Sequence, residues 1–225
     1  RRRVAMRLLH LLLALQTGRR YPNPFGVYVT GIDRKEEEED PDSFAAAKQK
    51  ETFNYTGAVM ALPTGVQAIA AARYGRSDEA LDYLQRLARS FSYAAPGSMY
   101  EVSPDYGMLV QAWNIYSVAT PIVGYFLGIQ PQAHLRQIVI RPRLPSAWTE
   151  AAINRLPVGD NELSFSIEDN IYKVNHLRAD WEVILEVPAG SGYRLNGVEA
   201  EPEWVVNGRA GFLLKEKENS LEVVW

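Results

Sequence analysis

The stretch Pro104–Gly128, PDYGMLVQAWNIYSVATPIVGYFLG, decides the fold, because it is long, apolar and has almost no polar face. Pro104 suits the first turn of a helix, and Gly128 suits its end. A helix that is apolar all round is buried all round. Pro121 should kink this helix or divide it in two. The stretch therefore predicts a buried inner helix over residues 104–127.

Three further helices are expected upstream, at residues 3–17, 64–74 and 78–92. Thr64 is a plausible N-cap for the second of them, and Gly75 is a natural stop. The third helix carries its apolar residues on one stripe, so it should lie on the outside of a helical assembly. An amphipathic helix followed by a buried one is typical of an outer and an inner ring of helices.

From about residue 136 the pattern changes to short β-branched and aromatic runs separated by turn signals such as Asn-Gly and Pro-Ala-Gly. Leu163, Phe165 and Ile167 alternate with polar residues, as in a half-buried antiparallel strand. The strands expected include 137–141, 162–167, 171–175, 182–187, 203–206, 211–214 and 221–225. We therefore predict an α+β chain of two domains: helices in residues 1–135 and an antiparallel β-sandwich in residues 136–225.

The net charge of −3 and the lack of cysteine exclude several classes of protein. Binding of nucleic acid needs a basic surface, so no nucleic-acid partner is expected. A chain without cysteine has no disulfide framework and no thiolate metal site, which fits a bacterial cytoplasmic protein. The spacing of His10, His134 and His176 matches no zinc site, so neither a metal nor a cofactor is expected. The apolar run at residues 8–15 is too short to span a bilayer, so no membrane partner is expected.

Acidic residues in ordered, aromatic surroundings are the candidates for chemistry, because hydrolysis of a glycosidic bond uses one protonated and one ionised carboxyl group. They are Asp33, Glu51, Glu101 and Asp105. Glu101 follows Tyr100 and the turn signal Pro96-Gly97-Ser98, just before the apolar helix. Its alternative role is that of a carboxylate that only accepts backbone hydrogen bonds in the turn. Asp105 has the competing role of stabilising the positive end of the helix.

Aromatic rings near these acids offer faces on which a sugar could stack, notably those of Tyr100 and Trp113. A tryptophan on an apolar helix is nevertheless more often part of a core. Asp33 ends an insert rich in aromatic residues, proline and glycine, in which a short strand is expected at residues 26–30. An insert of this length in a compact domain is usually functional or disordered.

Two motifs make the chain resemble the C-terminal part of bacterial six-hairpin glycosidases. One is Tyr100–Trp113 with FLGIQP at 126–131 and IRPRLPSAW at 140–148; the other is NYTGAVMALPTG at 54–65. The second motif is similar to one of the glycogen-debranching (amylo-α-1,6-glucosidase) type, and the α-L-rhamnosidase-like proteins are the next most similar. Thr56 stands where the debranching family usually has histidine, and Met60 where it has tryptophan.

This resemblance implies that residues 1–135 are the last third of an (α/α)6 barrel with an inverting mechanism. By position, Glu101 corresponds to the general base, which precedes the Gln-Ala-Trp helix that begins at Gln111. Tyr55, Tyr100, Trp113, Asp33 and Asp105 are then expected, with Gln111, to contact the sugar. The general acid would come from helices that this chain lacks. A second polypeptide supplying the N-terminal part of the barrel is therefore an expected partner, beside the saccharide.

Two other functions fit the same residues. A non-catalytic carbohydrate-binding or structural module would bind saccharide without hydrolysing it and would not depend on Glu101. A helical scaffold that binds no sugar is less well supported, because tyrosine, tryptophan and asparagine are dense around residues 52–57 and 98–114. The leading hypothesis is a glycoside hydrolase acting on α-linked oligosaccharides or polysaccharides.

Overall fold

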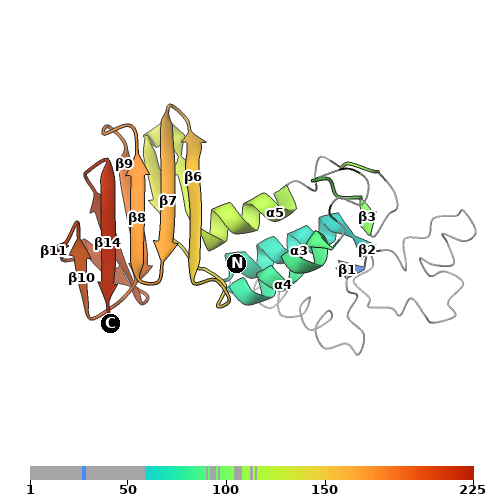
Figure 1. Cartoon of the computed structure of the whole chain (residues 1–225), viewed down its shortest axis with the longest axis horizontal. Coiled ribbons are helices and arrows are strands. Elements are labelled where there is room, and N and C mark those ends of the chain that lie inside the picture. Colours follow the sequence, from blue (N-terminus) through green and yellow to red (C-terminus); the bar gives the residue numbers. More distant parts are fainter. Residues whose placement is uncertain are drawn as a thin grey trace, which may run out of the picture. The chain divides into compact units, whose positions relative to one another are not determined.

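A computed structural model describes residues 27–28, 59–89, 91, 95, 97–103, 108–111, 114 and 116–225. The chain divides into two compact units, Arg1–Pro121 and Ile122–Trp225 (Figure 1). The second unit starts before residue 136, the boundary expected from sequence, because strand β4 (Ile129–Gln132) already pairs with β5 (Gln137–Ile140). The helix expected at residues 3–17 lies outside the described residues.

Among its described residues, the first unit has three helices and a small antiparallel sheet. The helices are α3 (Ala61–Arg73), α4 (Ser77–Ala88) and α5 (Tyr116–Pro121). The sheet has the order β1-β2-β3, formed by Val27–Tyr28, Val59–Met60 and Val102–Ser103. Strand β1 confirms the short strand expected at residues 26–30, and Gly75, with φ of 78°, follows α3 as expected. The unit is therefore mixed, not purely helical.

Thr64 is not the N-cap of α3, because the helix begins earlier, at Ala61. The threonine side chain lies inside the helix, and its Oγ1 donates to the Met60 carbonyl oxygen, at 2.7 Å. This bond back to the preceding turn is a common solution for a buried helical threonine. Thr64 is fully buried, so the hydroxyl needs such an internal partner.

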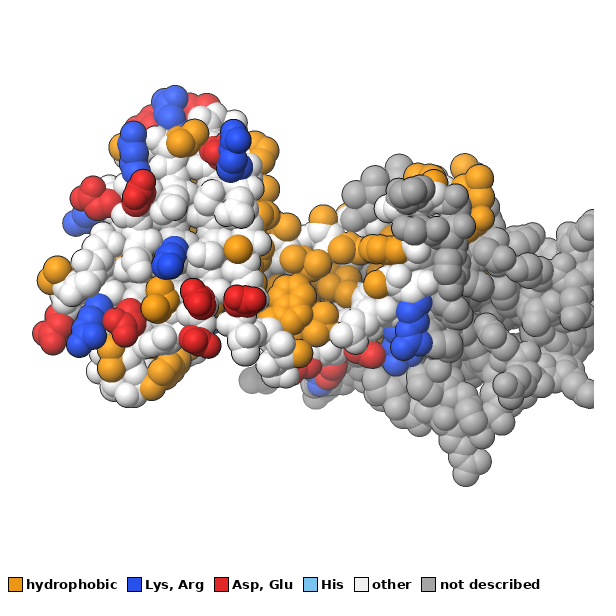
Figure 2. Space-filling model, viewed as in Figure 1, with side chains coloured by type: hydrophobic (Ala, Val, Ile, Leu, Met, Phe, Trp, Pro, Cys, Tyr) orange, Lys and Arg blue, Asp and Glu red, His pale blue; other side chains and the backbone are white. Residues whose placement is uncertain are grey.

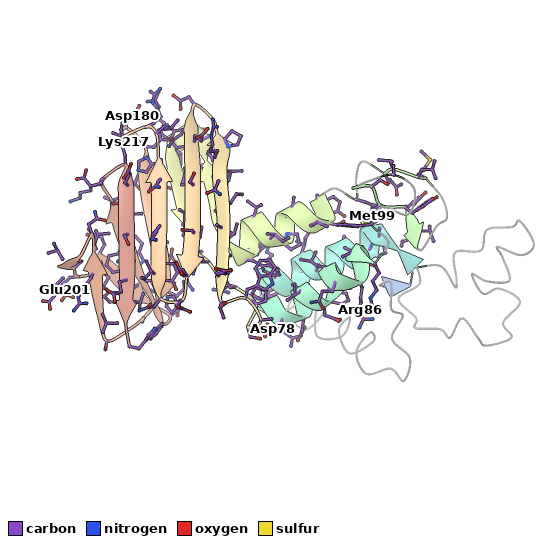
Figure 3. All side chains as sticks on the ribbon, in the orientation of Figure 1. Asp78, Arg86, Met99, Asp180, Glu201 and Lys217 are labelled. Carbon is purple, nitrogen blue, oxygen red and sulfur yellow. The ribbon has the colours of Figure 1, made fainter. Side chains whose placement is uncertain are left out.

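Helix α4 has the amphipathic pattern expected of an outer helix. It buries Ala80, Tyr83, Leu84 and Leu87 on one face. Figure 3 shows Asp78 and Arg86 on the same helix, near its opposite ends. An acidic residue in the first turn and a basic one in the last turn both stabilise the helix dipole.

The inner helix expected over residues 104–127 is wrong at Met108–Val110. These three side chains are 58–61% exposed, and their backbone is irregular instead of helical, with a bend at Leu109 and Val110. Pro121 does divide the later part: the α-helical hydrogen bonding of α5 ends there, and a π-helix, η3 (Ile122–Phe126), follows. Leu127 N–H donates to the Ile122 carbonyl oxygen five residues back, at 2.8 Å. Proline has no N–H to continue the α-helical ladder, which explains the change at this position.

The second unit contains two sheets (Figure 1). The six-stranded sheet has the order β11-β10-β14-β8-β7-β6, with β6 (Glu150–Val158), β7 (Asn161–Glu168), β8 (Ile171–His176), β10 (Gly192–Leu195), β11 (Val198–Glu199) and β14 (Glu218–Val224). The five-stranded sheet has the order β12-β13-β9-β5-β4, with β9 (Glu182–Pro188), β12 (Trp204–Val206) and β13 (Arg209–Leu214) beside β5 and β4.

The expectation of a wholly antiparallel arrangement is wrong for one pair of strands. β5 and β9 pair in parallel, with Ile138 opposite Val183 and Ile140 opposite Leu185. Parallel neighbours need a long connection, and here the chain forms β6, β7 and β8 of the other sheet before it returns. The five-stranded sheet is therefore mixed.

One cluster of buried side chains holds the second unit together, and both sheets contribute to it. Alternate residues of β7 (Leu163, Phe165, Ile167) and β9 (Val183, Leu185, Val187) are buried, which confirms the alternation seen in the sequence. Each fully buried large aliphatic or aromatic side chain contributes about 1.5–3 kcal/mol. No helix in the described part of the chain is long and apolar enough to cross a membrane.

Candidate functional site

Glu101 lies where the segment before β3 meets the start of α3. Its carbonyl oxygen accepts a hydrogen bond from Ala61 N–H, at 3.0 Å, and the next residue, Val102, pairs with Met60 of β2. Met99 and Val102 are buried on either side of it, and Figure 3 shows Met99 near the beginning of α3. The backbone of Glu101 is thus fixed between a buried strand and a helix.

The side chain of Glu101 closes a loop with Met108. The Glu101 N–H donates to the Met108 carbonyl oxygen at 3.0 Å, and Met108 N–H donates to Glu101 Oε2 at 3.3 Å. The residue is half-buried. Within the described residues no hydrogen bond reaches Oε1. One carboxylate oxygen therefore orients the group, and the other is available to a water or a substrate hydroxyl.

Asn114 joins the two ends of the same loop. Its Nδ2 donates to the Tyr100 carbonyl oxygen at 3.2 Å, and to Gln111 Oε1 at the long distance of 3.5 Å. Its N–H donates to the Gln111 carbonyl oxygen at 3.0 Å. The side chain is 1% exposed, and its Oδ1 is buried without a hydrogen-bond partner. A buried amide oxygen without a partner is costly, which makes it a functional candidate.

The structure brings together three of the residues singled out from sequence: Tyr100, Glu101 and Gln111. Asp33, Tyr55, Asp105 and Trp113 lie outside the described residues. Asn114 was missed, although it belongs to the stretch that decides the fold. The signal that marks it is an amide residue within the apolar part of this stretch, between Trp113 and Ile115.

Among the residues that the structure describes, no three or more histidine, aspartate or glutamate side chains are grouped so that they could hold a metal ion. The functional groups next to Glu101 in the site are its own carboxylate, the tyrosine Tyr100 and the amides of Gln111 and Asn114. The carboxylate can accept a proton from water, and the other groups can hydrogen-bond to hydroxyl groups.

Comparison with solved structures finds glycoside hydrolases and a phosphorylase. The α-L-rhamnosidase from Dictyoglumus thermophilum is similar to 73% of this chain, at 10% identity and a TM-score of 0.49. The Streptomyces avermitilis α-L-rhamnosidase complexed with L-rhamnose is similar to 80% of it, at 17% identity and a TM-score of 0.47. A putative kojibiose phosphorylase from the human microbiome matches 76%, at 12% identity and a TM-score of 0.40.

These matches cover 21%, 19% and 22% of the three larger proteins, so the chain spans about a fifth of their length. No protein-family model matches the sequence. No curated protein matches it.

Proposed function

We propose that this chain is the C-terminal part of an (α/α)6-barrel glycoside hydrolase, with Glu101 as the general base that activates water. The observation that carries the proposal is the position of the Glu101 carboxylate. It is half-buried on a fixed backbone, and one of its oxygens is oriented by Met108 N–H, at 3.3 Å. A general base must be held in place and must keep one oxygen for its proton.

Inversion requires a second carboxyl group about 6.5–9.5 Å from the first, with a water molecule between the base and the sugar. We place that general acid on a segment outside this sequence, in the same or a separate polypeptide. Such a segment would also cover apolar surface of the helices. Figure 2 shows apolar side chains gathered over the helical part of the chain, and Val66 of α3 is 49% exposed.

Tyr100 and Gln111 would line the sugar subsite next to Glu101, since Asn114 ties both of them to the same loop. Asp33, Tyr55, Asp105 and Trp113 stay proposals from the sequence resemblance. The substrate is proposed to be an α-linked saccharide. Comparing the rates at which the complete enzyme hydrolyses α-1,6-linked glucosides and α-L-rhamnosides decides between the debranching and rhamnosidase types.

The substitution Glu101→Gln tests the proposal in the complete enzyme. Glutamine keeps an acceptor oxygen for Met108 N–H, so folding should be preserved, whereas it cannot take a proton from water. We expect kcat to fall about 10²- to 10⁴-fold, the usual contribution of a general base. Glu168→Gln, at an exposed position at the end of β7, is the matched control. A kcat within twofold of wild type in Glu101→Gln would remove Glu101 from the mechanism.

A non-catalytic saccharide-binding module is the second candidate, because the hydrogen bond from Met108 N–H would also give the Glu101 carboxylate a purely structural role. In that case the carboxylate only closes the loop, and the variant Glu101→Gln binds oligosaccharide as wild type does. Native mass spectrometry gives an independent test. A complex with a larger polypeptide carrying the missing helices supports the hydrolase, and a chain of 25.3 kDa alone favours the module.

A further inference from the structure

The five-stranded sheet of the second unit carries a tryptophan at the edge of its outward face. Ala210, Phe212 and Leu214 of β13 are buried in the core, so Gly211 between them faces the other side of the sheet. Trp204 of β12 is directly opposite Gly211 in the register. Residues directly opposite each other in paired strands share one face of the sheet, so Trp204 lies on the outward face.

The indole ring of Trp204 lies over Gly211. A Cβ at Gly211 would lie 2.2 Å from Trp204 Cε2, 2.3 Å from Cζ2 and 2.6 Å from Nε1, so the ring fills the space above the glycine. Such cross-strand packing shields the glycine backbone and limits the rotation of the ring. It uses only one face of the ring, and Trp204 is still 37% exposed. An apolar ring surface is therefore presented to solvent in a defined orientation.

A pair of polar side chains follows on the same face. Glu186 of β9 is opposite Gly211 on the side away from Trp204. Arg141 Nε donates to Glu186 Oε2 at 2.6 Å, and Arg141 Nη2 donates to Glu186 Oε1 in the bidentate arrangement. Adjacent strands are about 4.8 Å apart, so the backbones of Trp204 and Glu186 are separated by about 10 Å. A sugar ring lying on the indole would have its rim next to the Arg141–Glu186 pair.

The charge of Glu186 is already balanced, so this face does not call for a charged ligand. Besides the bonds from Arg141, Arg209 Nε lies 3.9 Å from Glu186 Oε2. Arg209 Nη2 donates to the carbonyl oxygens of Glu186 and Pro142, the latter at 3.2 Å. The Arg141 side chain is 39% exposed, and its guanidinium has more N–H donors than the two that Glu186 accepts. Arg141 can therefore donate to a hydroxyl group while it stays bound to Glu186.

A pyranose ring matches both features, because it has a face of C–H groups and a rim of hydroxyl groups. The C–H face packs on an aromatic ring, and the hydroxyl groups accept hydrogen bonds from a planar guanidinium. A second copy of the chain is a less suitable occupant. β12 offers three exposed residues, Trp204, Val205 and Val206, whereas a stable interface uses about 20–30 residues a side.

We propose that this outward face binds a neutral pyranose unit of a saccharide chain, with Trp204 lying against the sugar ring and Arg141 donating to its hydroxyl groups. The site lies within the second unit and does not depend on Glu101. Binding there is compatible with either function considered above.

NMR of the full chain labelled with ¹⁵N tests the proposal at the site itself. The chain has five tryptophans, and the indole N–H signal of Trp204 is identified by its loss in Trp204→Ala. The probes are maltotetraose and sorbitol, which has hydroxyl groups but no ring. We expect maltotetraose to shift the Trp204 signal with a millimolar Kd and sorbitol to leave it unchanged.

The amide signal of Gly211, which lies under the indole, follows binding in the variants. Trp204→Ala should weaken maltotetraose binding at least about fivefold, because the sugar loses its apolar contact. Arg141→Lys keeps a positive charge beside Glu186 but has fewer donors, and it should weaken binding about threefold. Trp225→Ala is the matched control. Trp225 is 69% exposed, more than Trp204, but it lies beyond the end of β14, so its loss should leave the affinity unchanged.

Wild-type affinity in Trp204→Ala or in Arg141→Lys overturns the proposed contacts, and an equal shift with sorbitol overturns the assignment to a sugar ring. The absence of a Trp204 shift at about 50 mM maltotetraose, where a site of millimolar Kd would fill, overturns the site itself. A Trp204 signal that moves when sugar-free protein is diluted would assign the face to a second copy instead. The shift should persist in Glu101→Gln, so this test and that of Glu101 fail independently.

Discussion

Asn114 donates a hydrogen bond from its buried side chain to the carbonyl oxygen of Tyr100, at 3.2 Å, and so ties the segment that carries Glu101 to the chain before α5. The bond spans a sequence separation of 14 residues. It holds the backbone next to the proposed base and does not touch the carboxylate itself. Asn114 is therefore a positioning residue in the proposed site.

Replacing Asn114 with alanine should loosen this loop. We expect a loss of stability of about 1–3 kcal/mol, because the half-buried Tyr100 and Gln111 lose hydrogen bonds from the buried Asn114 side chain. If Glu101 is the base, kcat should fall about tenfold while KM changes little, since the base is misplaced and not removed. Urea denaturation and steady-state kinetics measure the two effects. Asn154→Ala, at an exposed position on β6, is the control; equal behaviour of the two variants would contradict the role of Asn114.

Gly65 of α3 allows close contact with α5. A Cβ at this position would lie 2.0 Å from Ser117 Oγ and 2.3 Å from Ser117 Cβ. Gly65→Ala should therefore destabilise the first unit by about 1–3 kcal/mol, the usual cost of overpacking. Helical circular dichroism during urea denaturation measures it. Gly124→Ala meets nothing within 4 Å and should cost no stability.

The double variant Gly65→Ala, Ser117→Gly tests whether the loss of stability comes from the contact with Ser117. Removing the serine side chain frees the space that the new methyl group needs, so part of the lost stability should return. A double variant no more stable than Gly65→Ala alone would show that the cost comes from another contact.

Strand periodicity explains why so much of the second unit follows from the sequence. Burial of alternate residues in β7 and β9 is a local pattern, so it can be recognised in the sequence without knowing which residues pack against these strands. Strand β6 was missed because Pro157 and the bulge between Ile153 and Leu156 interrupt its alternation. Such features are tolerated on an edge strand, and edge position is a property of the assembled sheet.

The candidate site was predictable only in part, since its contacts are between segments. Glu101 could be chosen for its place before the helix, but its pairing with Met108 depends on how the loop closes. The exposure of Met108–Val110 also contradicts the local apolar pattern. The parallel pairing of β5 with β9 is likewise set by long-range packing. Local periodicity carries no information about these partners.

Tyr83 of α4 should make the protein sensitive to alkali. Burial raises the pKa of Tyr83 from 10.0 to about 12, and its hydroxyl group is buried without a hydrogen-bond partner. Above pH 10 the unfolded chain loses this proton while the folded chain keeps it. The free energy of unfolding should therefore fall as pH rises from 10 to 12.

Tyr83→Phe removes this titration and leaves no unsatisfied hydroxyl. We expect the variant to be as stable as wild type or more stable at pH 8, and its stability to fall less steeply above pH 10. The slope should not vanish, because burial also raises the pKa of Tyr116 and Tyr172. Urea denaturation at several pH values gives both slopes; identical slopes would show that Tyr83 ionises equally in both states.

The pairing of Arg141 with Glu186 should be the main electrostatic support of the second unit. Glu186 is 12% exposed, and it lies between the bidentate Arg141 and the buried Arg209. Glu186→Gln leaves both guanidinium groups without their shared counter-charge. Breaking a buried pair costs about 3–5 kcal/mol, and the 39% exposure of Arg141 reduces the expected loss to about 2–3 kcal/mol.

Thermal denaturation of Glu186→Gln should show this loss, and Glu182→Gln is the matched control, because Glu182 is exposed on the same strand. The double variant Glu186→Gln, Arg141→Gln should recover stability, since one of the unpaired charges is removed with its partner. If Glu186→Gln were as stable as the Glu182→Gln control, carbonyl oxygens alone would suffice to hold Arg209.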